Sequence, residues 1–216
     1  MIKFLLFLSF IFTFIFESAK AQSALDSTQK AKEFINLEEA LKKPENVYRL
    51  NLSNQSLKIA DTIWSKFSNL QYLSFKNAHL TQIPTGIGYL RNLNVLDLSG
   101  NDFELLPSTF TNLTKLQELY LNDEKNFQFE RVIPILSKLP NLKSLHLEND
   151  ELNSLPNNFY MLNQLESLYL NNNRFEYVPV EIGGLKNLKF LDFHDNILRT
   201  PIQDNQIQSF GFKIRF

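Results

Sequence analysis

Cysteine is absent from this chain of 216 residues. The absence excludes disulfide bonds, thiolate metal sites, a cysteine nucleophile and a lipidated N-terminal cysteine. A folded state must therefore depend on the packing of its hydrophobic core alone. Apolar residues make up 44% of the chain, an ordinary share for a folded protein. The length suits one globular domain or one short repeat array.

An excess of charge of one sign is also missing, because the formal net charge is −1. It gives no electrostatic reason to expect a nucleic-acid partner. The glycine-rich motifs GxGxxG and GxxxxGK[ST], which hold nucleotide phosphates, do not occur, and the pair Gly183-Gly184 forms neither. We therefore expect no cofactor and no nucleic acid.

The chain has no apolar run long enough to span a bilayer comfortably. Leu5 to Phe16 is nearly all Leu, Ile and Phe, and this run of about 12 residues falls short of the ~20 that a membrane helix needs. Lys3 precedes it, and Ala19-Lys20-Ala21 follows with the small-x-small pattern of a signal-peptidase site. Residues 1–21 are predicted to be a signal peptide, with an uncleaved membrane anchor as the alternative. Cleavage would leave an exported protein, periplasmic, cell-surface or secreted, with no stable membrane span.

A leucine pattern recurs through most of the chain with a period of 23 residues, broken by one interval of 26. Its units begin at Val47, Leu70, Leu93, Leu116, Leu142, Leu165 and Leu188. Each unit continues as L-x-x-L-x-L-x-x-N-x-L, as in Leu93–Phe103, and we number repeat positions from the first residue. Leucines at positions 4 and 6 have the period of two that is typical of a strand with one buried face.

This pattern resembles that of the leucine-rich-repeat family over residues 47–198. The 23-residue period, with Leu-Pro in the second half as at Leu106-Pro107, is similar to the type common in bacterial exported and surface proteins. The resemblance implies an α/β fold, a curved solenoid of about seven coils with parallel strands on its concave face. It also implies that the side chain at position 9 bonds backbone groups of the turn. The residues in that role would be Asn101, Asn173 and Asn196, with Gln55 and Asp150 as substitutes.

The longer interval indicates an insertion in the fourth unit. Counted from Leu116, Asn126 would occupy position 11, which is apolar in the other units. If the additional residues lie between Asn122 and Gln128, Phe129 takes position 11 instead. The core positions that follow are then filled by Val132, Leu136 and Leu139.

The two ends of a solenoid need caps, because they would otherwise expose its core. At the N-terminal end, residues 22–46 are expected to supply a short helical cap over Asn36–Pro44. Asn36 is its predicted N-cap, and Glu39 completes a capping box. At the other end, residues 199–216 form a tail whose alternating apolar residues predict a strand over Phe210–Phe216. We interpret it as a C-terminal cap; the alternative is a resemblance to the last strand of an outer-membrane barrel.

The concave face is the expected binding surface, since positions 3, 5 and 7 point outward from the strands. In its middle, position 5 is Tyr120, His146 and Tyr169 in consecutive units. These residues are flanked by Glu118, Asp123 and Glu148. Rigid aromatic rings among polar groups are typical of binding hot spots. Such residues also tolerate a strand surface without any role in binding.

The sequence therefore predicts a non-catalytic binding module that acts outside the cytoplasm, with a protein partner. The alternative is a structural or adhesive surface protein that recognises a glycan or cell-wall polymer. The aromatic rings alone would serve a glycan, whereas a basic protein partner would also use the acidic flank. Catalysis or metal binding at His146 is disfavoured, because the predicted surface is shallow and solvated.

Overall fold

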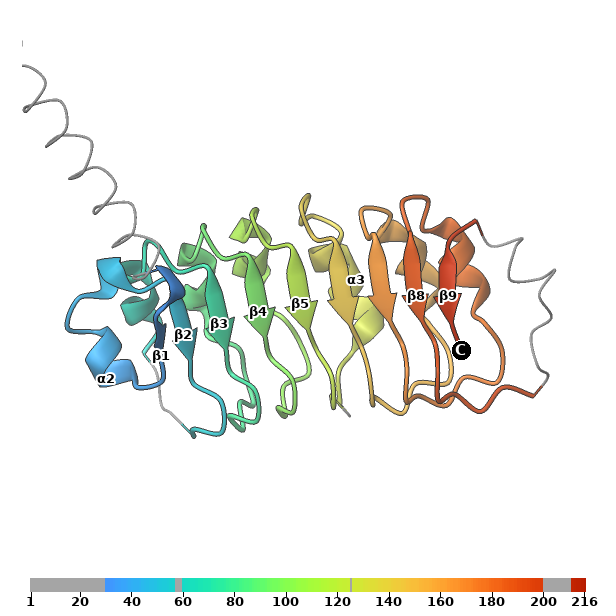
Figure 1. Ribbon diagram of the computed structural model, residues 1–216, viewed down its shortest axis with the longest axis horizontal. Helices are drawn as coiled ribbons and strands as arrows, with labels where there is room; N and C mark the ends of the chain where they lie inside the picture. Colours follow the sequence, from blue (N-terminus) through green and yellow to red (C-terminus); the bar gives the residue numbers. More distant parts are fainter. Residues whose placement is uncertain (1–29, 57–59, 125, 200–210) are drawn as a thin grey trace, which may run out of the picture.

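The protein forms a single curved solenoid built around one continuous parallel sheet (Figure 1). The computed structural model describes residues 30–56, 60–124, 126–199 and 211–216. The predicted signal peptide at residues 1–21 lies outside them. In the described ranges, no helix is both long enough and apolar enough to cross a membrane.

The sheet has nine strands in the described part of the chain, and their order in space follows their order in the sequence. The strands are β1 (Glu33–Phe34), β2 (Arg49–Asn51), β3 (Tyr72–Ser74), β4 (Val95–Asp97), β5 (Glu118–Tyr120), β6 (Ser144–His146), β7 (Ser167–Tyr169), β8 (Phe190–Asp192) and β9 (Lys213–Arg215). Position 4 of one unit pairs with position 4 of the next, as Leu96 does with Leu119. Every coil therefore repeats the same register.

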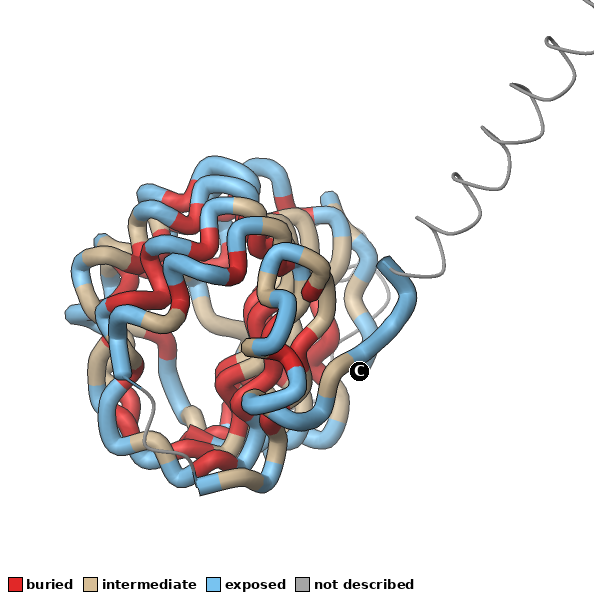
Figure 2. The backbone as a smooth tube through the Cα atoms, turned by 90° about the vertical axis from the view of Figure 1, so that its left-hand side faces the viewer, coloured by how far each residue is buried: buried red, intermediate tan, exposed pale blue. Residues whose placement is uncertain are grey.

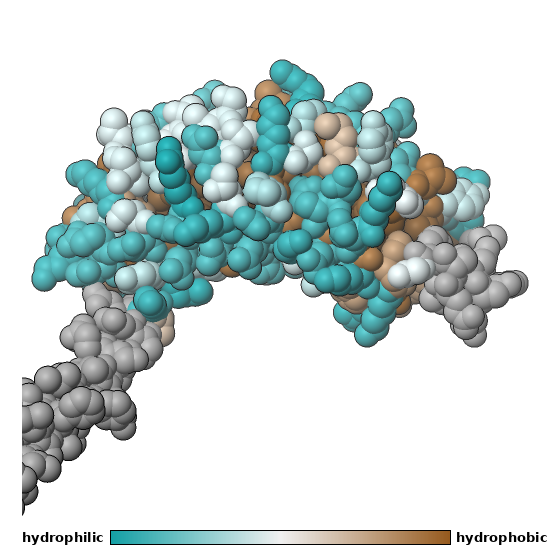
Figure 3. Space-filling view, turned by 90° about the horizontal axis from the view of Figure 1, so that it is seen from above, coloured by the Kyte–Doolittle hydropathy of each residue, from teal (hydrophilic) through white to brown (hydrophobic). Residues whose placement is uncertain are grey.

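Most of the short helices return the chain on the side opposite the sheet, whereas α2 lies at the N-terminal end beside β1 (Figure 1). They are α2 (Leu37–Ala40), η1 (Pro44–Asn46), η2 (Asp61–Lys66), η3 (Thr85–Tyr89), η4 (Ser108–Asn112), α3 (Phe129–Leu136), η5 (Asn157–Met161) and η6 (Val180–Gly184). Pro84, Pro107, Pro156 and Pro179 each lie immediately before one of the 3₁₀ turns η3–η6. Neighbouring strands lie about 4.8 Å apart, and the helical segments behind them need more room, so the solenoid bends with the strands on its inner side. Figure 3 shows the arch from above.

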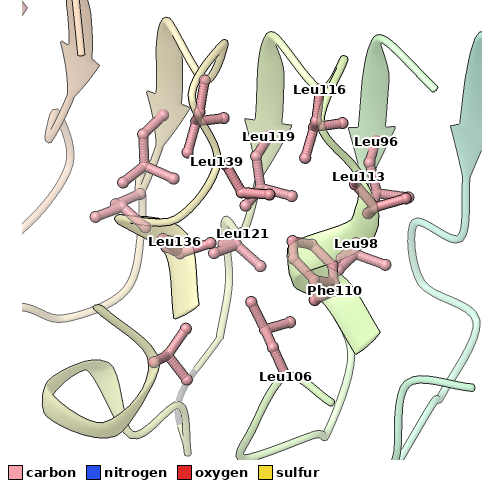
Figure 4. Close-up of a cluster of buried hydrophobic side chains, with 14 of the residues drawn as sticks. Leu96, Leu98, Leu106, Phe110, Leu113, Leu116, Leu119, Leu121, Leu136 and Leu139 are labelled. Atoms are coloured by element: carbon pink, nitrogen blue, oxygen red, sulfur yellow. The ribbon is translucent and has the colours of Figure 1, made fainter. Parts of the chain in front are cut away.

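The core is a column of leucine and phenylalanine side chains inside the coils. Leu96, Leu119 and Leu145, at position 4 of three neighbouring units, are fully buried. Leucines from adjacent strands point toward one another and toward Phe110 and Leu136 on the helical side (Figure 4). Figure 2 shows the same arrangement end-on, with buried segments lining the inner wall of the tube. No coil can bury its leucines alone, so each stabilises its neighbours.

Position 8 gives each strand its exit turn. Six such residues have positive φ, from 54° to 65°, namely Asn54, Asn77, Asp123, Asn149, Asn172 and Asp195. The seventh is Gly100, with φ of 68°. Asn and Asp enter this left-handed region more readily than other side chains, and glycine enters it freely. The recurrent Asn, Asp or Gly at this position is therefore a backbone requirement.

Position 9 forms a ladder of side chains inside the turns, as the resemblance implied. The side-chain oxygen of Asn173 accepts from the backbone N–H groups of Asp150 and Leu152, at 3.1 and 3.0 Å. Its amide donates to the carbonyls of Leu147 and Leu170, at 2.7 and 3.0 Å. Asn101 makes the equivalent bonds in the coil before the insertion. Asn196 makes most of them at the end of the array.

The insertion is distributed differently from the prediction. Phe127 is the ring buried beside Phe103, with centroids 5.6 Å apart, while Phe129 is only partly buried. Position 11 is thus held by Phe127, so one additional residue precedes it and two follow it. Helix α3 absorbs those two, because an α-helical segment takes more residues than the 3₁₀ turns of the other coils. Val132, Leu136 and Leu139 are fully buried, as expected.

Both ends extend the sheet by one strand. Asn36 is the N-cap of α2, as predicted, and its side chain accepts from the Glu39 N–H at 2.9 Å. The helix is shorter than predicted, because it ends at Ala40 and Pro44 begins η1 instead of ending the helix. Strand β1 precedes this helix and pairs with β2, an addition that the helical interpretation of the segment missed. Strand β9 confirms the strand expected in the tail, and it pairs parallel with β8.

Candidate functional site

The strand register brings the three predicted rings together on the concave face. Tyr120 is paired with His146, and His146 with Tyr169, across β5, β6 and β7. All three hold position 5, between the buried leucines of positions 4 and 6, so alternation along the strand turns their side chains outward. We call Tyr120, His146 and Tyr169 the aromatic row.

The rings of the aromatic row stack face to face. The centroids of Tyr120 and His146 are 3.9 Å apart with an interplanar angle of 17°. Those of His146 and Tyr169 are 4.0 Å apart at 6°. The distance between ring centroids is somewhat shorter than the distance between neighbouring strands, about 4.8 Å, so the rings lean together and leave no gap between them. Phe190 extends the row with an edge-on contact to Tyr169 at 5.6 Å.

Two glutamates hold the central imidazole from both sides. Nε2 of His146 lies 3.1 Å from a carboxylate oxygen of Glu118, and Nδ1 lies 3.2 Å from one of Glu148. A neutral imidazole has one N–H and donates to only one of them, whereas a ring with both protons donates to both. The hydroxyl of Tyr120 donates to the same Glu118 oxygen at 2.6 Å. Sequence neighbours on two strands are thereby joined into one network.

The phenol groups are held in their neutral form. Burial, followed by the hydrogen bond to Glu118 and the charges of Glu118, Asp97 and Glu148, raises the pKa of Tyr120 above its usual value of 10. Burial and the charges of Glu118, Glu148 and Asp192 raise the pKa of Tyr169 in the same direction. Both side chains can therefore act as hydrogen-bond donors throughout the physiological pH range.

Asp123 is the predicted site residue that stands apart. It lies in the exit turn after β5, with φ of 62°, and its side chain accepts a hydrogen bond from the amide of Asn149. Asn149 occupies the same turn one coil further on. The structure thus brings five of the six predicted residues into one network and places Asp123 at its edge, in the ladder of turn residues.

Two features near the row were not chosen from the sequence. Asp97 is the strand neighbour of Tyr120, and it adds an acidic group at the other end of the row. Glu124, at position 9 of the unit that carries the insertion, is only 2% exposed although its side chain is a carboxyl group. The repeat numbering places Glu124 at the ladder position, so the signal was available in the sequence.

The aromatic row offers no arrangement for a metal ion. Among the residues that the structure describes, no group of three or more His, Asp or Glu side chains is arranged to hold a metal ion. A groove of about 670 Å³ lies elsewhere, and its lining includes Leu155, Tyr177 and Val180. The chemistry available at the row is therefore aromatic contact, hydrogen bonding by phenols and attraction of positive charge.

The comparisons with known proteins agree with this architecture. Residues 47–134 match the family model described as "Leucine-rich repeat region", and residues 164–185 match "Leucine Rich Repeat". A curated relative, leucine-rich repeat and IQ domain-containing protein 4 of Mus musculus, is 40% identical over 74 residues. That alignment covers 33% of this chain and 12% of the relative.

Solved structures with the same fold come from distant proteins. One is in the Toll–Spatzle complex of Drosophila, with a TM-score of 0.61 and 18% identity over 71% of this chain. An internalin from Listeria monocytogenes has a TM-score of 0.57 and 20% identity over 84%. The TLR13–ssRNA13 complex has a TM-score of 0.64 and 27% identity over 81% of this chain.

The chain spans only part of these proteins: 20% of the first, 57% of the second and 25% of the third. At such identities, the first two show the fold alone. The repeat spacing, the position-9 ladder, the parallel sheet and the matched family models all lead to the same assignment. This chain belongs to the leucine-rich-repeat proteins.

Proposed function

We propose that this protein is a non-catalytic module that binds another protein through its concave face and acts outside the cytoplasm. The observation that carries the proposal is the stacked aromatic row, held by Glu118 and Glu148 on both sides of His146. Rings that are already ordered lose little conformational entropy on binding, which is why such groups dominate binding energies.

The chemistry of the row favours a protein partner with a basic segment. Glu118, Glu148 and Asp97 surround the rings and leave the middle of the face acidic, since His146 is the one basic group of the network. Arg or Lys side chains of a partner would meet carboxylates and phenol hydroxyls there. The same charges would repel the phosphates of a nucleic acid.

A glycan or cell-wall polymer is the alternative ligand, favoured by the aromatic rings themselves. Sugar rings pack against open aromatic faces. In this row the inner faces of Tyr120 and Tyr169 are covered by His146, at 3.9 and 4.0 Å. The remaining edges and hydroxyls suit polar protein groups better, so we place the glycan second.

Action outside the cytoplasm is supported by the apolar run Leu5–Phe16 and by the site Ala19-Lys20-Ala21. Export is tested by expressing the full chain, separating cell fractions and sequencing the N-terminus of the recovered protein. A protein that begins at Gln22 in the envelope or the medium would support the proposal. Retention of the uncleaved chain inside cells would contradict it.

Binding is tested by capture from envelope and culture extracts with the protein that begins at Gln22. A triple variant, Tyr120→Ala with His146→Ala and Tyr169→Ala, is compared with a control that changes Tyr89, Tyr160 and Tyr177 to Ala. The control removes three exposed tyrosines from other surfaces, 61%, 57% and 57% exposed. Loss of a partner with the first variant only, together with weaker capture in high salt, is the expected result.

Retention of the partner by the aromatic-row variant would overturn the concave-face assignment. If neither protein nor RNA is captured, a glycan array probed with the same three proteins decides between the two ligand classes. Circular dichroism of each variant confirms that the fold is intact before binding is compared.

A further inference from the structure

Two carboxyl groups replace asparagine in the middle of the position-9 ladder. The ladder runs Asn101, Glu124, Asp150, Asn173 in four consecutive coils. Glu124 accepts from the backbone N–H of Asn101 at 2.9 Å, and Asp150 accepts from that of Glu124 at 2.7 Å. These bonds are the counterparts of the bond that Asn173 accepts from Asp150. One oxygen of each carboxyl thus does what the asparagine oxygen does.

The second oxygen of each carboxyl has no partner. Oε2 of Glu124 and Oδ2 of Asp150 are buried without a hydrogen bond within the described residues. The two residues are 2% and 6% exposed. In asparagine the corresponding atom is Nδ2, which donates to backbone carbonyls, as Nδ2 of Asn101 does to Phe75 and Leu98. An ionised carboxylate has no proton to donate at this place, whereas a protonated carboxyl has one.

The surroundings oppose ionisation. The charged groups that face the pair are Asp102 after β4, Asp123 after β5 and Glu148 after β6, all acidic. The flanking rungs, Asn101 and Asn173, are neutral. Burial raises the pKa of Glu124 to about 9, although its hydrogen bond from Asn101 acts in the opposite direction. Burial likewise raises the pKa of Asp150 to about 8.

We propose that Glu124 and Asp150 are a proton-dependent latch, protonated rungs that hold the turns after β5 and β6 together and release them when they ionise. The second oxygen of each then carries the proton and donates where Nδ2 donates in the neighbouring coils. Ionisation removes two donors and places two adjacent negative charges among three others inside the turns.

The latch lies in the turns that follow β5 and β6, the strands that carry Tyr120 and His146. The backbone N–H of Glu148 donates to the side chain of Asn122 at 3.0 Å, and the N–H of Asp123 donates to the carbonyl of Glu148 at 3.2 Å. Glu148 in turn holds His146. Loosening these turns therefore displaces one of the two carboxylates that fix the row. Control of ligand binding by the latch rests on the proposed function, but the latch itself does not.

The direction of the pH effect follows from the raised pKa of both groups in the fold. The stabilisation is fully present below the pKa values of the unfolded chain, 4.5 for Glu124 and 3.8 for Asp150. It is lost as the pH rises through the pKa values of the fold, about 9 for Glu124 and about 8 for Asp150. The folded protein should consequently lose stability from mildly acidic to mildly alkaline pH. Amide side chains at these positions supply donors at every pH and do not titrate.

The test measures thermal unfolding of the purified protein that begins at Gln22, between pH 5 and pH 9 and without any ligand. The variant carries Glu124→Gln and Asp150→Asn, and Glu45→Gln, an exposed glutamate, is the control. The melting temperature of the double variant should rise relative to the wild type by more than about 4 °C from pH 5 to pH 9. The control should stay parallel to the wild type. Parallel profiles for the double variant would overturn the proposal.

Two further measurements keep the proposal falsifiable if the double variant does not fold. Asn173→Asp adds a third carboxyl rung and should make the melting temperature fall more steeply with pH than in the wild type. Carboxyl ¹³C NMR of the wild type should show one Glu and one Asp that titrate above pH 7. Titration of every carboxyl below pH 6 would overturn the latch.

Hydrogen exchange then separates the latch from its proposed consequence. At pH 9, peptides that cover residues 119–127 and 144–152 should exchange faster in the wild type than in the double variant. Because no ligand is used, failure of ligand capture would not affect this result. Equal exchange with a confirmed pH-dependent stability would show that the latch holds the coils without reaching the aromatic row, and would overturn its control of the site.

Discussion

The imidazole of His146 lies parallel to the phenol ring of Tyr169, with centroids 4.0 Å apart and an interplanar angle of 6°. Their side chains come from coils 23 residues apart, so the contact exists only because the coils are in register. The same imidazole is held at both nitrogens by Glu118 and Glu148. One side chain thus joins ring stacking along the sheet to hydrogen bonding across it.

Replacing His146 with phenylalanine should separate these two contributions. The phenyl ring keeps a stack between Tyr120 and Tyr169 but loses both bonds to the glutamates, so Glu118 keeps the hydroxyl of Tyr120 and Glu148 loses its bond to the ring. We expect the fold to remain and capture of a basic partner to change, with stability altered by about 1 kcal/mol. Near-ultraviolet circular dichroism of the tyrosines checks the stack. A loss of fold with His146→Phe, but not with His146→Gln, would contradict this division of roles.

Removing one central core leucine should destabilise the whole array. Leu145 is fully buried at position 4, so Leu145→Ala leaves a cavity between coils and should lower the free energy of unfolding by about 2–5 kcal/mol. Urea denaturation measures the loss. The adjacent Ser144→Ala, on the outer side of β6, is the matched control and should stay within about 0.5 kcal/mol of the wild type. Equal effects from both changes would refute the assignment of the strand faces.

The asparagines of the position-9 ladder should contribute more to the free energy of unfolding than exposed asparagines do. Asn101→Ala removes bonds to the N–H groups of Ala78 and Leu80 and to the carbonyls of Phe75 and Leu98. The Leu80 N–H and the Leu98 carbonyl then become unpaired, whereas the Ala78 N–H still donates to the Phe75 carbonyl at 3.1 Å. Leaving such buried groups unpaired should cost about 2–4 kcal/mol. Denaturant unfolding checks it against Asn153→Ala, which changes an exposed asparagine. A similar small effect at both sites would show that water replaces the ladder.

Two glycines on the helical side should respond oppositely to alanine. A Cβ at Gly86 would lie 2.0 Å from the backbone oxygen of Asp61, so Gly86→Ala must push η2 and η3 apart. A Cβ at Gly183 meets nothing within 4 Å. We expect Gly86→Ala to lower the melting temperature by several degrees and Gly183→Ala to leave it unchanged or raised slightly. A tolerated Gly86→Ala would mean that these turns are packed less closely than described.

The repeat was determined by the sequence itself. Leucines at positions 4 and 6 recur with the coil period, and because equal positions stack, the sequence predicts the parallel sheet and the neighbouring places of Tyr120, His146 and Tyr169. The Asn36 cap and the tail strand were likewise predictable, since a cap needs only local side chains and a strand only its alternation.

Contacts between coils were decided by the tertiary structure. The sequence does not say that Phe127 rather than Phe129 packs beside Phe103, because both fit the spacing and the choice depends on how α3 begins. Nor does it predict β1, whose two residues form a strand only by pairing with β2. The clamping of His146 by two glutamates arises in the same way, as does the burial of the second carboxyl oxygens of Glu124 and Asp150 without a hydrogen bond. Each depends on the distance between side chains of different coils, and only the packed solenoid sets that distance.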